Sequence, residues 1–365
     1  MKALRILHTE SSLGWGGQEI RILTEARAVA RRGHAVTLAA PAEARIAREA
    51  PRYGVDTATL PIGRKNLRGL FALRQYLARE RFDVVNTHSS TDSWLAALAC
   101  ATRSPAPPIV RTRHISASAG RNAATRWLYG RATARVVTTG ERLRRQVIEE
   151  TGVDAARVVS ISTGIDLAVF KPGDRLASRA ALGLPRDAAI VGIVATLRDW
   201  KGHHDLLRAM ARLSPATLLA IVGDGPQRDS LEELVAELGI GARVRLAGEQ
   251  IDVAPWMRSF DVFCLPSYAN EGVPQALMQA MACAIPVVTT NVGSIAEIVS
   301  DGVTGVFTAP RDPQALAAVL GALLGDATRR AELGARAAAA ARERFGEERM
   351  VERMLEVFDT VAARA

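Results

Sequence analysis

Residues 261–282 place a carboxylate at the start of a helix, next to glycine and proline. The sequence is DVFCLPSYANEGVPQALMQAMA, in which FCLPS ends an apolar strand and VPQALMQAMA has a helical pattern. Pro274 suits the first turn of that helix, where a missing N–H group costs nothing. The free N–H groups and partial positive charge of a helix N-terminus bind anions. Glu271 beside them would accept hydrogen bonds from hydroxyl groups attached to a bound phosphate.

Gln279 follows Glu271 by eight residues and lies one helical turn further in. Its amide can accept from one hydroxyl and donate to another, so it can serve a second polyol. A nucleotide-sugar is a ligand of this kind, because its phosphate groups lie between two polyols, the ribose and the sugar. The alternative is that Glu271 only stabilises the helix N-terminus through its charge.

A second loop, ATLRDWKGHHDLL at residues 195–207, follows a strand and brings positive charge. Arg198 and Lys201 are both placed to bind a phosphate. Arg198 would do so through its planar guanidinium, which can form two hydrogen bonds at once, and Lys201 through its compact ammonium charge. A solvated helix start is the alternative. In the loop IVGDGPQR at residues 221–228 we interpret Gly223 as a turn former.

The loop LGWGGQE at residues 13–19 joins the first strand to a helix. Gly16 and Gly17 permit close approach of the backbone to an anion, and a tight turn is the equal alternative. The dinucleotide pattern GxGxxG is absent from this loop.

Two of the six histidines, His88 in NTHSS and His114 in RTRHIS, end predicted strands. Neither is spaced as a metal ligand, and no DxD-like pair ends a strand. We therefore expect a site with no metal and no cofactor, in which cationic side chains and helix dipoles take the role of an ion.

Short apolar runs alternate with helical patterns along the whole chain, which predicts an α/β fold with parallel sheets covered on both faces. The pattern starts again after the polar segment 162–175, and 365 residues exceed the size of one core, so we expect two doubly wound domains. Ligands of such sheets lie beyond the carboxyl ends of the strands. The segment 347–365 has an apolar helical stripe made of Met350, Met354, Phe358 and Val361.

The charge is uneven, with a net of +12 over residues 1–170 and −3 over residues 171–365. The excess of positive charge is greatest between Arg111 and Arg145. The same stretch contains the aromatic residue Trp127. Arginines beside interfacial aromatic residues favour an anionic acceptor or a membrane surface, whereas a solvated basic face is the alternative. Nucleic acid is the least favoured partner because no nucleic-acid motif accompanies the charge. The predicted acceptor or membrane face comprises His88, Arg113, Arg121, Arg126, Trp127 and Arg131.

Three distant cysteines without a CxxC pair indicate a reducing compartment. The start, MKALRILHTESS, turns polar after seven residues and reads as a strand rather than a signal peptide. No run of about 18 apolar residues occurs, so we expect no membrane span. The predicted location is the cytoplasm, with peripheral attachment to the inner face of the cytoplasmic membrane.

Taken together, these loops resemble those of the retaining GT-B glycosyltransferases of family 4, over nearly the whole chain. The most specific part is the block 261–290, followed by GSIAEIVSDGVTGVF; the family has a glutamate, seven residues and a second glutamate at this place. The resemblance implies two Rossmann-like domains facing a central cleft. The implied domains are an acceptor domain at 1–165, a donor domain at 166–345 and a helix at 346–365 that crosses back to the first domain.

The resemblance also implies roles for single residues. Glu271 would bind the donor sugar, Lys201 would neutralise the diphosphate, and His114 would lie near the reacting sugar, and these three form the implied catalytic set. The implied donor-binding set comprises Gly16, Gly17, Thr196, Arg198, Lys201, Gly223, Gly272, Val273, Pro274 and Gln279.

Two positions depart from the family pattern. Gln279 replaces the second glutamate, and Thr196 replaces an arginine that Arg198 could supply from a different backbone point. Because both changes keep hydrogen-bonding capacity, we expect an active enzyme.

The sequence therefore predicts a retaining hexosyltransferase that takes its sugar from a UDP- or GDP-linked donor. The predicted acceptor is a glycan or a lipid-linked glycan of cell-surface polysaccharide or lipopolysaccharide synthesis. Two alternatives stay open: a nucleotide-sugar epimerase, and a non-catalytic protein that binds nucleotides or glycans.

Overall fold

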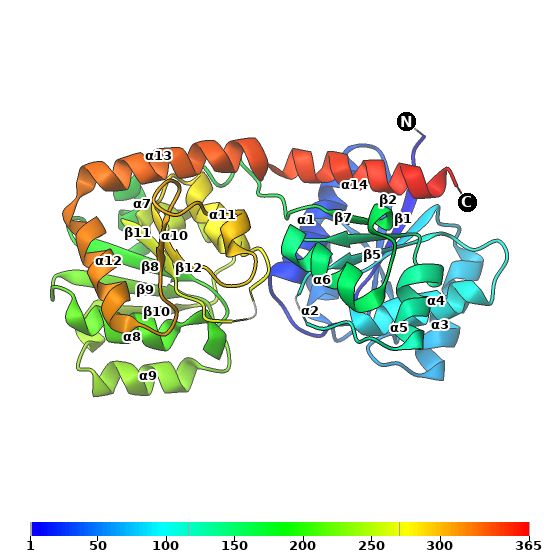
Figure 1. Ribbon diagram of the computed structural model, residues 1–365, viewed down its shortest axis with the longest axis horizontal. Helices are drawn as coiled ribbons and strands as arrows, with labels where there is room; N and C mark the ends of the chain where they lie inside the picture. Colours follow the sequence, from blue (N-terminus) through cyan, green and yellow to red (C-terminus); the bar gives the residue numbers. More distant parts are fainter. Residues whose placement is uncertain (1, 116, 270, 365) are drawn as a thin grey trace. The chain divides into compact units, whose positions relative to one another are not determined.

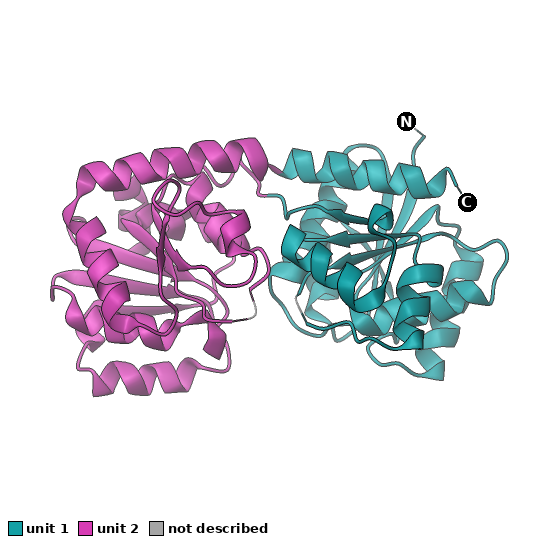
Figure 2. Ribbon diagram, viewed as in Figure 1, with its two compact units in different colours: residues 1–164, 347–365 teal, residues 165–346 magenta. Residues whose placement is uncertain are grey.

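The computed structural model describes residues 2–115, 117–269 and 271–364. The chain forms two compact units, one made of residues 1–164 with 347–365 and the other of residues 165–346 (Figure 2). Each unit is an α/β sandwich around its own parallel sheet (Figure 1). The predicted fold class, two doubly wound parallel-sheet domains, is confirmed.

The sheet of unit 1 has seven parallel strands in the order β3-β2-β1-β4-β5-β6-β7. The strand order reverses beside β1, which pairs with both β2 and β4, so ligands are expected near its carboxyl end. The strands are β1 (Arg5–Thr9), β2 (Ala35–Ala40), β3 (Asp56–Thr59), β4 (Val84–Thr87), β5 (Ile109–Arg113), β6 (Arg135–Thr138) and β7 (Val158–Ser160).

Helices cover both faces of this sheet because its strands send alternate side chains to opposite sides. Ile6 and Val84 enter a core with α1 and α14, while Leu7 and Val85 enter a core with α3 and α4. The helices are α1 (Gly17–Arg31), α2 (Arg45–Glu49), α3 (Leu67–Arg79), α4 (Ser90–Ala101), α5 (Ala123–Trp127), α6 (Glu141–Thr151) and α14 (Glu347–Ala362).

The last helix, α14, lies in unit 1 although the chain reaches it from unit 2. The predicted stripe of Met350, Met354, Phe358 and Val361 is buried in the core that α14 shares with α1.

The sheet of unit 2 has six parallel strands in the order β10-β9-β8-β11-β12-β13. They are β8 (Ala189–Val194), β9 (Thr217–Val222), β10 (Val244–Gly248), β11 (Val262–Leu265), β12 (Val287–Thr290) and β13 (Val306–Thr308). The helices are α7 (Arg175–Leu182), α8 (His203–Arg212), α9 (Arg228–Glu237), α10 (Ala254–Ser259), α11 (Gln275–Ala282), α12 (Pro313–Gly325) and α13 (Ala327–Arg344).

The segment SIAEIVS, whose apolar spacing would suit a helix, forms only a single 3₁₀ turn at Ile295–Glu297. Gly293 just before it has φ +60°, which breaks the backbone away from a regular helix. Among the described residues, no helix is both long and apolar enough to span a bilayer.

Candidate functional site

In unit 2 the structure brings together the two charged residues that the sequence proposed for donor binding. Lys201 Nζ lies 2.7 Å from Glu271 Oε1, and Ser267 Oγ donates to the same oxygen at 2.6 Å. Glu271 is 4% exposed, so its charge is held by these two partners and little water. Both side chains come from loops at the carboxyl ends of strands, β8 for Lys201 and β11 for Glu271.

Two glycines allow these loops to touch. A Cβ on Gly202, which has φ +76°, would lie 2.1 Å from the carbonyl oxygen of Pro266. A Cβ on Gly293 would lie 1.9 Å from the carbonyl oxygen of Glu271. The Lys201–Glu271 contact therefore depends on backbones that approach more closely than any side chain permits.

Three other predicted donor residues lie in the loops after β8 and β9. Thr196 is partly buried, and exposed Arg198 has its guanidinium 5.8 Å from the ring centre of Trp200. Gly223 is structural, because its Cβ would lie 2.0 Å from the carbonyl oxygen of Ala195.

Helix α11 starts beside Glu271, as the sequence predicts. Pro274 is its N-cap residue, Val273 packs its side chain into the core of unit 2, and Gly272 is partly exposed. Gln279, in the second turn, is partly exposed and free to meet a ligand from solvent. The helix N-terminus thus remains a candidate anion site next to the carboxylate.

A neighbouring cluster was missed from the sequence. Tyr268 donates to Asp199, and the guanidinium of Arg311 lies 4.0 Å from the Tyr268 ring centre. Arg311 has φ +58°, a conformation that is strained for a residue other than glycine. The sequence contains one indication of this cluster, which is that Arg311 lies in a polar turn after a strand.

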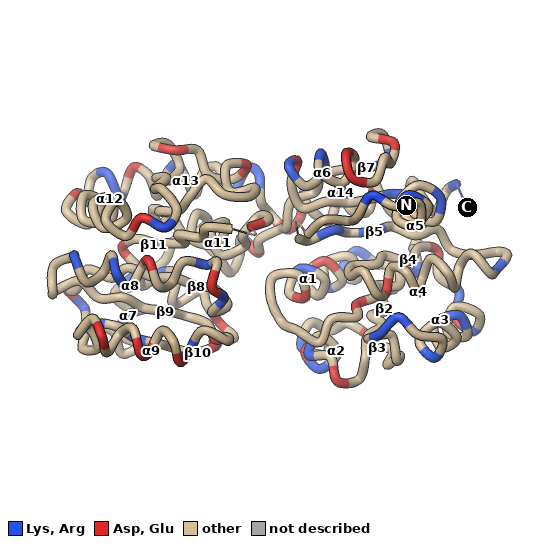
Figure 3. Tube along the Cα trace, turned by 60° about the horizontal axis from the view of Figure 1, so that its bottom comes forward, with Lys and Arg blue, Asp and Glu red and all other residues tan. Residues whose placement is uncertain are grey.

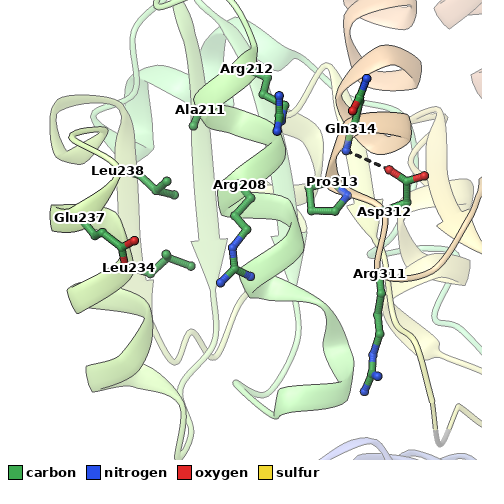
Figure 4. A pocket seen from close by; sticks show the side chains of 10 residues that line it. All are labelled: Arg208, Ala211, Arg212, Leu234, Glu237, Leu238, Arg311, Asp312, Pro313 and Gln314. Atoms are coloured by element: carbon green, nitrogen blue, oxygen red, sulfur yellow. Dashed lines mark hydrogen bonds between the residues drawn. The ribbon is translucent and has the colours of Figure 1, made fainter.

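Arg311 also borders a pocket of about 460 Å³ between α8, α9 and the start of α12. Figure 4 shows the side chains of Arg208 and Arg311 extending to the same side of this pocket. Asp312 already accepts from the backbone N–H groups of Gln314 and Ala315, so the α12 N-terminus is neutralised by its own cap.

In unit 1 three histidines from three neighbouring strands are joined in series. His8 Nδ1 lies 2.9 Å from His88 Nε2, and His88 Nδ1 lies 3.0 Å from His114 Nε2. His8 and His88 are buried, and His114 is partly buried. Burial lowers the pKa of His8 to about 4 and lowers the pKa values of His88 and His114 well below their ordinary value, so all three are neutral.

Two buried carboxyl groups organise the loop that carries the glycines. Glu10 accepts from the N–H of Ser12, from Ser89 and from Gln18. Asp92 accepts from the N–H groups of Ser89 and His88 at the start of α4. Burial, and after it the charge of Asp92, raises the pKa of Glu10 to about 8. Burial raises the pKa of Asp92 to about 6.

The glycine loop itself leads into α1. Gly16 is the N-cap residue of α1 in extended backbone, and Gly17 is the first helical residue. A Cβ on Gly16 would meet nothing closer than 3.8 Å, so the fold of unit 1 leaves open space at this position.

The predicted basic face is only partly on the surface. Arg121, Arg126 and Arg131 are exposed, as expected. Arg113 is wrong as a surface residue: it is buried, and its Nη1 donates to the Tyr129 hydroxyl at 2.9 Å. Strand β5 sends residue 113 inward beneath the helical segment 123–132, where a guanidinium needs buried acceptors.

Two more members of that face also lie inside. His88 is buried in the histidine series, so its place on an acceptor or membrane surface is wrong. Trp127 is partly buried and stacks on Trp94 at a centroid distance of 6.0 Å.

Comparisons with known proteins agree with this architecture. Residues 15–169 match the family model described as Glycosyltransferase Family 4, and residues 174–343 match the model described as Glycosyl transferases group 1. Each unit therefore matches a glycosyltransferase domain model over most of its length. The described residues contain no group of three or more His, Cys, Asp or Glu side chains arranged to hold a metal ion.

A curated relative is the D-inositol 3-phosphate glycosyltransferase of Mycobacterium tuberculosis, 36% identical over 244 residues. The match covers 64% of this chain and 47% of the relative, so the chain spans about half the length of the curated relatives it matches.

Two solved structures share the fold. HepE of Anabaena in complex with UDP superimposes with a TM-score of 0.86 at 23% identity, over 98% of this chain and 100% of the other. A glycosyltransferase of Rickettsia africae has a TM-score of 0.88 at 18% identity, over 100% of both chains.

Proposed function

We propose that the chain transfers a sugar from a nucleotide-sugar to an acceptor hydroxyl with retention at the anomeric carbon. The observation that carries this proposal is the Lys201–Glu271–Ser267 cluster beside the N-terminus of α11. It combines a cation for a leaving diphosphate, a carboxylate for sugar hydroxyls and a helix N-terminus for phosphate oxygens. The two glycosyltransferase domain matches support the same assignment.

The proposed catalytic groups are those that can stabilise the negative charge of the leaving diphosphate. As the bond between the sugar and the phosphate breaks, negative charge grows on the diphosphate, and preorganised donors aimed at it supply the largest catalytic contribution. Lys201, Arg198 and the α11 N-terminus are those donors in unit 2, and the Gly16–Gly17 loop is a further candidate in unit 1. Lys201 then exchanges part of its bond to Glu271 for a bond to phosphate.

Retention is proposed to follow from attack on the same face, with the leaving phosphate taking the proton of the acceptor. Glu271 is poorly suited to act as a covalent nucleophile because one of its oxygens already accepts from Lys201 and Ser267. A carboxylate held in this way suits the recognition of hydroxyl groups instead.

The donor is proposed to be UDP-linked. HepE, which shares the fold, was solved with UDP and with UDP-glucose. A GDP-linked donor is the alternative that the binding experiment below decides.

The acceptor is proposed to be an anionic or lipid-linked glycan of cell-surface or lipopolysaccharide synthesis. Helix α3 exposes Leu67 (70%) and Phe71 (57%) among basic residues, and α4 exposes Leu98 (41%). Arg74 Nε donates to Thr102 at 3.1 Å, one turn beyond Phe71 and Leu98, which ties the two helices together. Figure 3 shows basic residues along α3. Exposed apolar side chains among arginines suit the interface of an anionic membrane.

The donor assignment is tested by thermal shift against UDP- and GDP-sugars and the free diphosphates, with Glu271→Ala alongside. A shift for one nucleotide-sugar that Glu271→Ala reduces, followed by its transfer in an acceptor assay, would support the proposal. Binding without turnover would support a non-catalytic protein, and conversion of the sugar without an acceptor would support an epimerase.

The membrane assignment is tested by sedimentation with phosphatidylglycerol vesicles. Phe71→Ser with Leu67→Ser is expected to weaken binding at least tenfold, because two exposed apolar side chains are lost. Added salt should weaken the wild type. Binding that salt leaves unchanged, or no binding to anionic vesicles, would contradict the proposal.

A further inference from the structure

The three joined histidines of unit 1 form a chain of hydrogen bonds that runs from buried His8 to partly exposed His114. His8 lies within β1, His88 follows β4 and His114 follows β5, and these strands are neighbours in the sheet. The rings of His8 and His88 are parallel within 8° at a centroid distance of 5.2 Å. The rings bond one another in sequence instead of converging on a point, as metal ligands would.

Proton counting leaves only two arrangements for this chain. Three neutral imidazoles carry three protons, and two of these lie in the two hydrogen bonds, so one proton is left for an end of the chain. That end is either His8 Nε2 or His114 Nδ1. In the first case His114 offers a lone pair, and in the second case it offers an N–H donor.

The inner end of the chain decides between them. His8 Nε2 is buried and has no hydrogen-bond partner in the described residues. Around it, His8 meets the ring of Phe358 edge-on, at a centroid distance of 6.3 Å. A buried N–H group without an acceptor is rarer in proteins than an acceptor with an unused lone pair. The bare lone pair therefore belongs on His8 Nε2.

We propose that the protons of the chain point outward, from His8 to His88 to His114, so that His114 presents Nδ1–H as a fixed hydrogen-bond donor. His8 and His88 are then positioning residues that set the tautomer of His114. The geometry stands by itself, whereas its use on a donor or acceptor oxygen rests on the proposed function. His114 is partly exposed whereas His8 and His88 are buried, so the outer end of the chain is the one nearer to solvent.

Burial, and after it the charges nearby, lowers the pKa of His114 and keeps it neutral. Arg21 of α1 and Arg113 of β5 both oppose a further positive charge on His114, after the effect of burial. A neutral His114 with a fixed N–H group orients a sugar oxygen and does not take its proton. This excludes His114 as the general base and agrees with a phosphate in that role.

The tautomer is measured by ¹⁵N NMR of the histidine side chains in the full chain. The expected spectrum of His114 has a protonated Nδ1 and an unprotonated Nε2. The reverse pattern, or an average of the two, would overturn the proposal. This measurement needs no substrate, so it decides the tautomer even if no nucleotide-sugar is turned over and the proposed function fails.

The positioning role is measured with two substitutions of His88. His88→Leu removes the donor to His114 and is expected to lower kcat about tenfold to hundredfold, with little change in the donor KM and with a mixed His114 tautomer. His88→Gln keeps one acceptor and one donor and should recover most of kcat if it folds as the wild type does.

His34→Gln is the matched control, because His34 is a buried histidine that accepts from the N–H of Leu4, away from the histidine chain. It should leave kcat unchanged. An unchanged kcat in His88→Leu, with circular dichroism like that of the wild type, would overturn the positioning role.

Discussion

Lys201 and Glu271 are each other's counter-charge, with 2.7 Å between Nζ and Oε1. The lysine side chain is 20% exposed and the glutamate side chain 4%, so the pair is open to solvent from the lysine end only. An incoming diphosphate can therefore reach Lys201 without displacing Glu271 from Ser267. Glu271 would keep its place while its partner turns partly to the ligand.

Replacing Lys201 by Met is expected to lower kcat at least a hundredfold, because one charge-stabilising donor is lost from the transition state. It should also lower the free energy of unfolding by about 1–3 kcal/mol, since Glu271 stays buried with only Ser267 as partner. Steady-state kinetics and urea unfolding measure the two effects. Lys171→Met, at an exposed lysine in the same unit, is the control. A Lys201→Met enzyme with wild-type kcat would refute the leaving-group assignment.

Gly202 is expected to tolerate no side chain. Gly202→Ala places a Cβ 2.1 Å from the Pro266 carbonyl oxygen at φ +76° and should destabilise unit 2 by about 2 kcal/mol or more. Gly183→Ala is the matched control, with φ +63° and no atom within 4 Å of the new Cβ. It should cost only about 1 kcal/mol, from backbone strain. If the two variants lose the same stability in thermal unfolding, the backbone at Pro266 moves away from the new Cβ without cost, and the expected clash is wrong.

Much of this architecture could be predicted because the local patterns agree with the fold. Apolar runs such as AIVGIV predict central strands, since these are buried on both faces. Strand β3, DTAT, gives no such signal because it lies at the sheet edge and is mostly exposed.

The site could be predicted loop by loop but not pair by pair. Glu271 and Lys201 were placed at strand ends by their loops, yet their 70-residue separation hid the contact between them. His8 lies inside an apolar strand and bonds a residue 80 positions away, so no sequence spacing reveals the chain of three histidines.

Asp261 offers a direct comparison of a buried and an exposed ion pair on one carboxylate. Arg179 Nη2 lies 2.6 Å from it with a side chain 3% exposed, and Arg175 Nη1 lies 2.5 Å from it with a side chain 49% exposed. Arg179→Ala should lower the free energy of unfolding by about 3–5 kcal/mol, because a buried carboxylate loses its buried partner.

The matched substitution Arg175→Ala should cost less than about 1 kcal/mol, since water screens an exposed pair. Urea unfolding of the two variants under one condition checks the ranking. If Arg175→Ala lowers the free energy of unfolding more than Arg179→Ala does, the exposed ion pair of Asp261 stabilises the fold more than the buried one, and the expected ranking is wrong.

Glu10 makes stability depend on pH. Its folded pKa, about 8, is above its ordinary value, so the folded state holds a proton that the unfolded state has lost. Its contribution to stability is therefore complete below pH 4.5 and is lost as pH rises to about 8. The buried histidines act in the opposite direction, because their pKa values are lowered, but only below about pH 6.5.

Between pH 7 and 8 Glu10 should dominate, since burial raises the pKa of Glu25 only to about 7 and that of Asp92 only to about 6. We expect the midpoint of thermal unfolding to fall across this interval in the wild type and to stay nearly level in Glu10→Gln. Glu43→Gln, at an exposed glutamate, should keep the wild-type slope. If Glu10→Gln keeps that slope as well, Glu10 is ionised in the folded protein, and the loop that it organises with Gln18 and Ser89 is held by a buried charge instead of a neutral acid.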